Sequence, residues 1–179
     1  MRDYTPRAWD AAAGTFTLDF ALHDAGPATN WARSAQPGDT LQIGGPKGSA
    51  VVPDDFDWYL LIGDATALPS FSRRLEALRA GVHVTVLTLV TEPGENLDFQ
   101  TAAACQAHWL PASGTSQGDA AILIAALEQI QTPPGEGYVW IAAEATVSQQ
   151  LYLYFTEQRA HPRQWIKAST YWKRSETAS

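Results

Sequence analysis

A scarcity of cysteine and histidine limits what this chain can do. It has one cysteine among 179 residues, Cys105, which excludes a disulfide framework and a cysteine-cluster metal site. The four histidines, His23, His83, His108 and His161, lack the spacing of metal ligands. There is also no apolar run of about 18 residues and no apolar N-terminal signal region, which argues against a membrane span and against export. We therefore expect a cytoplasmic protein.

Basic residues are missing from the middle of the chain. No Lys or Arg occurs between Ala80 and Gln158, whereas acidic residues continue through that stretch. The formal net charge of −7 argues against general nucleic-acid binding. Two interpretations of the uneven charge stay open. It is either a chance arrangement of solvated faces, or the two ends of the chain build a cationic surface for an anionic ligand.

Several common catalytic and nucleotide-binding motifs are absent as well. The P-loop motif G-x-x-x-x-G-K-[ST], the zinc motif H-E-x-x-H and the nucleophile motif G-x-S-x-G do not occur. The dinucleotide fingerprint G-x-G-x-x-G is missing too, and the corresponding strand-to-helix turn at 63–69 reads G-D-A-T-A-L-P. Function therefore has to be argued from weaker local features and from their order.

Residues 1–53 are typical of antiparallel β structure. An extended segment at 2–7 precedes a turn at Ala13-Gly14, and alternation of apolar side chains predicts a half-buried strand over 15–23. Gly26-Pro27 opens a short predicted helix over 27–35, because proline is tolerated in a first helical turn. Another strand is predicted over 39–45 before a Gly-Pro break.

Residues 54–179 change to an alternation of strands and helices, which predicts a doubly wound parallel sheet. The continuously apolar run at 58–63 predicts a strand that is covered on both faces. Further strands are predicted over 83–90, 105–110, 138–143 and 164–172, and a helix follows Pro69. Two more helices are predicted, one capped by Asp119 and one started by a capping box at Thr146. The predicted fold class is α/β with an antiparallel β part in front.

Three local groups of residues are suited to a ligand. Arg2, Tyr4 and Thr5 share one extended segment, although in isolation this also fits an ordinary strand with a surface arginine. The helix start at 26–28 follows His23 and offers free N–H groups to a pyrophosphate, as every helix start does. The strand ends at 63–64 and 143–144 are expected to lie side by side at the carboxyl edge of the sheet, where open α/β sheets hold ligands.

The order of short motifs along the chain resembles the siderophore-interacting protein family. The motifs are R-x-Y-T, H-x-x-G-P-A-x-x-W-A, P-G-D, G-P-x-G, G-D-x-T-A-L-P, V-W-x-A-x-E-A and a terminal Y-W-[RK], and they span Arg2 to Arg174. The family comprises flavin-dependent ferric-siderophore reductases of the ferredoxin–NADP reductase superfamily. The resemblance implies part of a flavin-binding barrel over 1–53 and a Rossmann-like NAD(P)-binding domain over 54–179.

The resemblance also implies site residues, while no side chain is expected to be catalytic. The residues implied to bind the cofactors FAD and NAD(P)H are Arg2, Tyr4, Thr5, His23, Gly26, Pro27, Ala28, Thr29, Trp31, Asp64, Thr66, Ala67, Glu144 and Trp172. Within this set, the residues from Asp64 to Ala67 are implied to form the turn over which the reductant approaches. Lys167, Lys173 and Arg174 are implied to bind an anionic ferric siderophore.

Two departures from the family pattern leave alternatives open. Ala65 replaces the glutamate that commonly follows Gly-Asp, and R-x-Y-T, which normally lies midway through the barrel, begins at residue 2. We therefore expect the first part of the flavin barrel to be missing. The preferred interpretation is a monomeric ferric-siderophore reductase that takes electrons from NAD(P)H or a ferredoxin. The alternatives are an NAD(P)H–flavin oxidoreductase with another acceptor, and a truncated remnant that binds without turnover.

Overall fold

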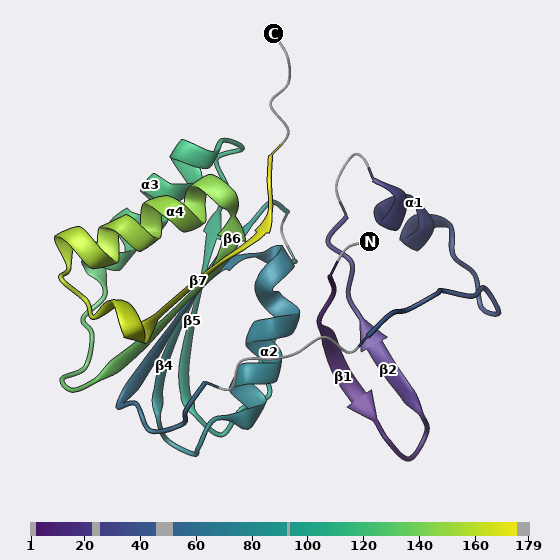
Figure 1. Ribbon diagram of the computed structural model, residues 1–179, viewed down its shortest axis with the longest axis horizontal. Helices are drawn as coiled ribbons and strands as arrows, with labels where there is room; N and C mark the ends of the chain where they lie inside the picture. The colour runs from purple at the N-terminus through teal and green to yellow at the C-terminus, as the bar shows by residue number, and fades with distance from the viewer. Residues whose placement is uncertain (1–2, 23–25, 46–51, 93, 175–179) are drawn as a thin grey trace, which may run out of the picture.

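The strand β3 (Trp58–Asp64) lies at the centre of a five-stranded parallel sheet. In the computed structural model, which describes residues 3–22, 26–45, 52–92 and 94–174, this sheet forms one body of the molecule (Figure 1). The strand order is β5 (Ala104–Pro111), β4 (His83–Val90), β3, β6 (Gly137–Glu144) and β7 (Ile166–Trp172). The order reverses between β3 and β6, which places the topological switch point of the sheet there.

Helices cover both faces of this sheet. Leu61 of β3 points to the face covered by α2 (Leu68–Ala77), where Phe71 packs, and Ile62 points to the face covered by α3 (Ser116–Gln129) and α4 (Ala145–Leu153). Every residue of β6 is buried, as expected for a parallel strand with a helix layer on each side. Full burial of side chains of this size contributes about 1.5–3 kcal/mol each. Among the described residues no helix is long and apolar enough to cross a membrane.

The N-terminal residues form a second, smaller body beside α2 (Figure 1). It consists of the antiparallel hairpin of β1 (Pro6–Asp10) and β2 (Thr15–Leu18), followed by α1 (Pro27–Ser34). The rings of Trp9 and Phe16 stack across the hairpin with centroids 5.8 Å apart. The predicted fold class, an antiparallel β part followed by a Rossmann-like α/β domain, is confirmed.

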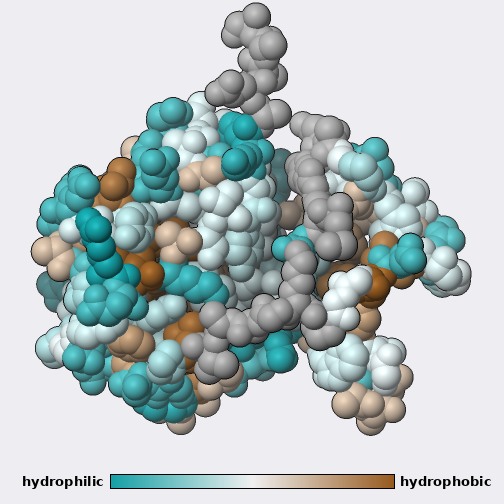
Figure 2. Space-filling view, viewed as in Figure 1, coloured by the Kyte–Doolittle hydropathy of each residue, from teal (hydrophilic) through white to brown (hydrophobic). Residues whose placement is uncertain are grey.

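Two predicted features of the N-terminal body differ from the structure. The strand predicted over 15–23 ends at Leu18, and no strand forms over 39–45. Leu41 and Ile43 are 44% and 58% exposed there, and Figure 2 shows brown hydrophobic residues on the surface of this body. An apolar segment forms a strand only where another strand accepts its backbone hydrogen bonds, and none of the described residues pairs with 39–45.

The two predicted helix caps in the α/β body were also wrong. Thr115, and not Asp119, caps α3 by accepting a hydrogen bond from the N–H of Gly118 at 3.1 Å. Helix α4 begins at Ala145, and its cap is the carboxylate of Glu144 rather than the hydroxyl of Thr146. In both cases a residue closer to the strand end reaches the free N–H groups first.

Arginines of α2 and the turn after it fix the segment that joins the two bodies. Arg74 donates to the carbonyl oxygens of Val52 and Pro53 at 3.1 and 2.8 Å, and Arg79 donates to the carbonyl oxygen of Asp54 at 2.8 Å. Hydrogen bonds from guanidinium groups are stronger than neutral ones, so the start of the α/β body is held against α2. The other end of α2 contacts the N-terminal body through Ser70, as described below.

Candidate functional site

Strands β3 and β6 approach each other closely at their carboxyl ends. Gly63 pairs with Ala142, and a Cβ atom at Gly63 would collide with the carbonyl oxygen of Ala142 and with the side chain of Ala67. Only glycine therefore fits at this position. The close approach places Asp64 and Glu144, which follow in the two strands, next to each other at the switch point. The predicted juxtaposition of these strand ends is confirmed.

The carboxylate of Asp64 accepts four hydrogen bonds. One oxygen, Oδ1, accepts from the N–H of Thr66 at 3.0 Å and from the hydroxyl of the same residue. The other, Oδ2, accepts from the indole N–H of Trp172 at 2.8 Å and from the N–H of Glu144 at 3.2 Å. Burial raises the pKa of the Asp64 carboxyl, although these hydrogen bonds act against the rise. The predicted reductant turn is therefore built around a satisfied carboxylate.

Glu144 is a buried carboxylate that closes the start of α4. It is 4% exposed and accepts from the N–H groups of Thr146 at 2.8 Å and Val147 at 3.3 Å. Its second oxygen accepts from the N–H of Arg174 at 3.3 Å. Burial opposes ionisation, but the hydrogen bonds from these N–H groups outweigh it and lower the pKa of Glu144. The free N–H groups of this helix start are thus already used by the chain itself.

The C-terminal segment binds across the same edge of the sheet. The guanidinium of Arg174 lies 3.3 Å from a carboxylate oxygen of Asp119, whose residue is 4% exposed, and 5.1 Å from the centre of the Trp172 ring. Asp119 also accepts from the N–H of Ser113 at 2.7 Å. Because Arg174 already pairs with this carboxylate, its charge is largely neutralised in the structure.

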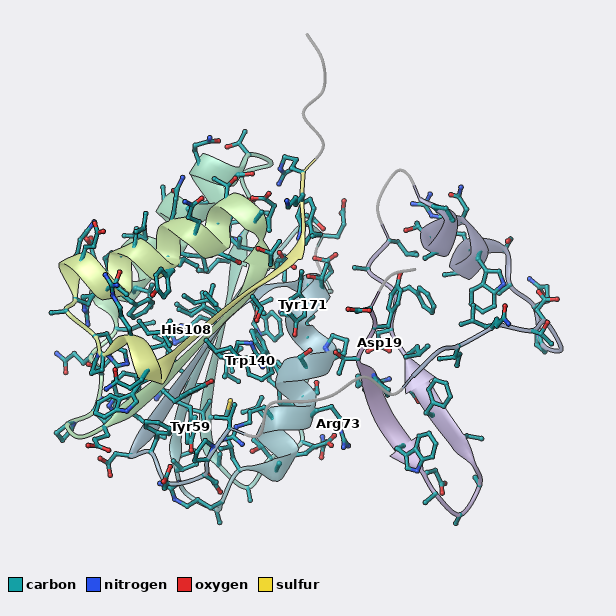
Figure 3. All side chains as sticks on the ribbon, in the orientation of Figure 1. Asp19, Tyr59, Arg73, His108, Trp140 and Tyr171 are labelled. Carbon is teal, nitrogen blue, oxygen red and sulfur yellow. The ribbon has the colours of Figure 1, made fainter. Side chains whose placement is uncertain are left out.

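A cleft of about 600 Å³ opens on the α2 face, between β1, α2 and β7. Trp140 of β6 lies in the cleft, and the ammonium of Lys167 sits 4.3 Å from the centre of its ring. Burial lowers the pKa of Lys167. Arg73 of α2 lines the cleft as well, and Figure 3 shows it below Tyr171 and Trp140. Cations beside an aromatic face favour a ligand that is anionic and at least partly planar.

Three hydroxyl groups line one side of this cleft and connect the two bodies. The hydroxyl of Thr5 lies 2.9 Å from that of Ser70, which lies 2.8 Å from the phenol oxygen of Tyr171. Ser70 is 5% exposed, in the first turn of α2. Thr5 precedes β1 and Tyr171 belongs to β7, so the hydroxyls come from three segments that are far apart in the sequence. We call Thr5, Ser70 and Tyr171 the hydroxyl chain.

The residues predicted to hold a flavin lie around the start of the N-terminal body. The ring of Tyr4 lies 4.9 Å from that of Phe20, which lies 5.9 Å from that of Trp31 on α1. Gly26 has a φ of 148°, which other residues rarely adopt, and no side chain caps α1. Uncapped N–H groups beside aromatic rings fit a dinucleotide with a planar ring, so the residues present are compatible with FAD. Arg2 and His23 lie outside the described residues.

The structure separates the three cations predicted to bind substrate. Lys167 lies in the cleft on the α2 face, Lys173 lines a second depression beside α4, and Arg174 pairs with Asp119. An irregularity in the pairing of β6 with β7, between Ala143 and Glu144, interrupts the alternation along β7. The three positions therefore do not form one surface, and only Lys167 shares the cleft with Thr5.

Sequence reasoning missed Ser70, Arg73 and Trp140 as cleft residues. Trp140 was named only as part of a buried strand, and α2 was interpreted from its apolar stripe alone. Ser70 lies next to that stripe and is buried, which is a signal for a polar partner. The partner could not be identified in advance, because Thr5 lies 65 positions away in the sequence.

Comparisons with known proteins agree with this arrangement. A family model described as "Siderophore-interacting protein" matches residues 56–175, and a model described as "Siderophore-interacting FAD-binding domain" matches residues 1–50. The NADPH-dependent ferric-chelate reductase of Escherichia coli is 34% identical over 176 residues, covering 96% of this chain and 65% of the relative. The chain thus spans slightly less than two thirds of that protein.

Two solved structures are similar over nearly the whole chain. A siderophore utilization protein from T. fusca is 34% identical with a TM-score of 0.85, and the match covers 98% of this chain and 67% of the other. The siderophore-interacting protein SipS from Aeromonas hydrophila is 28% identical with a TM-score of 0.84, covering 98% and 68%.

Proposed function

Since the chain belongs to the siderophore-interacting protein family, we propose that it serves flavin-dependent reduction of ferric siderophores. The observation that carries the proposal is the cleft, in which Thr5, implied to contact the flavin, shares one wall with the Lys167–Trp140 pair. A site for electron transfer to an anionic ferric complex needs a flavin edge and an anion-binding cation within one cavity. The cleft supplies residues suited to both.

The residues of this chain would bind and orient, and bound FAD would supply the transfer of electrons. Tyr4 and Thr5 would hold the ring, and the start of α1 would hold the pyrophosphate. Lys167 would attract a ferric siderophore, whose oxygen donors often carry negative charge. Overall, one NAD(P)H and two ferric siderophores would give NAD(P)⁺, one proton and two ferrous ions. Hard oxygen donors bind ferrous iron more weakly, so the iron is released.

The proposed donor is NAD(P)H, as in the name of the E. coli relative, or a ferredoxin. A donor would approach over the turn at Asp64 and Thr66, where the carboxylate of Asp64 already takes up the N–H of Thr66. Asp64 and Glu144 occupy helix starts at which many α/β proteins bind a pyrophosphate. The nucleotide phosphates would therefore have to bind elsewhere than at the starts of α2 and α4. A monomer acting in the cytoplasm is part of the same proposal.

A purified sample of the chain tests the proposal directly. We expect yellow protein, or uptake of added FAD with flavin absorbance bands, and formation of ferrous iron, followed with a ferrous chelator, when NAD(P)H and a ferric siderophore are added. A folded protein that takes up no FAD would contradict the proposal. Bound flavin with reduction of other acceptors only would favour a different NAD(P)H–flavin oxidoreductase, and binding of ferric siderophore without ferrous iron would favour a non-catalytic binding protein.

A further inference from the structure

The hydroxyl chain offers one proton per oxygen, and its surroundings determine which way those protons point. The Thr5–Ser70 and Ser70–Tyr171 contacts are 2.9 and 2.8 Å, so both are hydrogen bonds of normal length. Each hydroxyl can donate once and accept twice. A chain of this kind has two possible directions, one with Thr5 donating toward Tyr171 and one with Tyr171 donating toward Thr5.

Asp64 is the charged acceptor nearest to Tyr171 in electrostatic terms, and it has no place for the phenol proton. Its two oxygens already accept from the hydroxyl and N–H of Thr66, the N–H of Glu144 and the indole N–H of Trp172. A carboxylate has about four acceptor positions, so this one is saturated. Burial and the charge of Asp64 raise the pKa of Tyr171, which keeps the phenol protonated. The phenol proton is therefore directed to Ser70.

This direction passes along the chain and ends in the cleft. When Tyr171 donates to Ser70, the proton of Ser70 is available for Thr5, and the oxygen of Thr5 becomes an acceptor within the chain. The proton of Thr5 is then left to point away from Ser70. Because Thr5 lines the cleft, this proton is available to a ligand there. The cleft therefore presents a hydroxyl oriented as a donor.

We propose that Ser70 and Tyr171 are positioning residues that orient Thr5 as a hydrogen-bond donor to a ring nitrogen of the bound flavin. The proposal rests on the flavin site proposed above, and it adds a role for two residues that would not touch the ring nitrogen themselves. Hydrogen bonds to ring nitrogens are one of the ways in which a protein adjusts the redox properties of a flavin. A ring nitrogen that accepts in the oxidised flavin carries a proton after two-electron reduction, and it then needs an acceptor.

A donor that is fixed in place favours the oxidised flavin. The hydroxyl chain holds Thr5 in the donor direction, so reduction requires Thr5 to turn its proton away from the ring. A neutral hydrogen bond is worth about 0.5–1.5 kcal/mol net, which corresponds to roughly a threefold to tenfold preference for the oxidised form. For a two-electron couple, a tenfold preference lowers the midpoint potential by about 30 mV. Breaking the chain should therefore raise the potential.

The test compares midpoint potentials and FAD affinities of four variants of the full chain. Ser70→Ala and Tyr171→Phe each interrupt the hydroxyl chain, the double variant interrupts both links, and Ser72→Ala is the matched control. Ser72 is 9% exposed on the same helix and lies outside the hydroxyl chain. Potentials are measured by equilibration with reference dyes, and FAD affinity is measured separately for oxidised flavin by fluorescence quenching.

We expect Ser70→Ala to raise the potential by up to about 30 mV, a tenfold change in the oxidised-to-reduced preference. Tyr171→Phe should change the potential in the same direction, and the double variant should add little to the larger single effect, because both act through Thr5. Ser72→Ala should leave the potential unchanged. Unchanged or lowered potentials in flavin-bound Ser70→Ala and Tyr171→Phe would overturn the inference alone. A wild-type chain that binds no flavin would overturn the proposed function together with it.

Discussion

The indole N–H of Trp172 donates to the carboxylate of Asp64 at 2.8 Å, across 108 positions of the sequence. Trp172 ends β7, an edge strand that pairs only with β6, whereas Asp64 ends the central strand β3. The bond therefore ties the edge of the sheet to its centre at the switch point. It also places an indole ring over the turn that is implied to face the reductant.

Trp172→Phe tests this bond while keeping an aromatic ring. Removing the N–H leaves a carboxylate oxygen of Asp64 with one donor fewer, and a hydrogen bond to a charged group is worth about 1.5–3 kcal/mol. We expect the free energy of unfolding in urea to fall by about that amount. Trp9→Phe is the control, because Trp9 is 61% exposed and its replacement should change stability by less than about 0.5 kcal/mol. Equal effects of the two substitutions would contradict the importance of the Asp64 bond.

Glu144→Gln is expected to lower stability in a pH-dependent way. The pKa of Glu144 is lowered from its ordinary value of 4.5 in the folded protein, because the hydrogen bonds from N–H groups that favour the carboxylate outweigh its burial. Its contribution is therefore fully present above about pH 4.5 and is lost as the pH falls through the lower, folded-state pKa. The gap between wild type and Glu144→Gln, measured by urea unfolding, should be largest near neutral pH and should shrink in acid.

Asp64 has the opposite sign, which provides an internal comparison. Its pKa is raised from 3.8 by burial, so ionisation costs stability as the pH rises from 3.8 through the folded-state value. Asp64→Asn should therefore become less destabilising relative to wild type as the pH rises through this range. A gap between wild type and Glu144→Gln that stays constant from neutral pH down to pH 4 would contradict the assignment for Glu144.

Gly63→Ala should be among the most damaging single substitutions in the α/β body. The added methyl group would collide with the backbone oxygen of Ala142, which lies in a central strand and cannot move without breaking the sheet. We expect a loss of about 3 kcal/mol or more in thermal or urea unfolding. Gly81→Ala meets open space and has only its φ of 75° against it, so it should cost about 1–2 kcal/mol. A fully stable Gly63→Ala would show that β3 and β6 are further apart.

The parallel sheet could be predicted from the sequence because its strands are marked by local pattern. The run at 58–63 is apolar throughout, and burial on both faces leaves few alternatives for such a segment. The segment at 39–45 has a similar local pattern but forms no strand, since strand formation also depends on a pairing partner. Local pattern is therefore a sufficient guide only where the rest of the chain supplies both neighbours.

The candidate site could be predicted by position but not by contact. Asp64, Glu144 and Trp172 were expected at one edge of the sheet, and the structure brings them together. Their use as hydrogen-bond acceptors and donors for one another, including the capping of α4 by Glu144, depends on distances of a few ångströms that no spacing reveals. The same holds for Ser70, whose two partners come from opposite ends of the sequence.

Lys167→Ala tests which of the three C-terminal cations binds an anionic ferric complex. Lys167 lies over Trp140 in the cleft, so its loss should weaken binding of an anionic ferric siderophore by about tenfold. Lys173→Ala removes the same charge beside α4, outside this cleft, and should have little effect. Binding is followed by quenching of tryptophan fluorescence at two salt concentrations, because the charge contribution falls as salt is added. The pKa of Lys167 is lowered from 10.5 by burial, so wild-type affinity should begin to fall at a pH below that at which an exposed lysine loses its charge. Equal losses for Lys167→Ala and Lys173→Ala would place the anion outside the cleft.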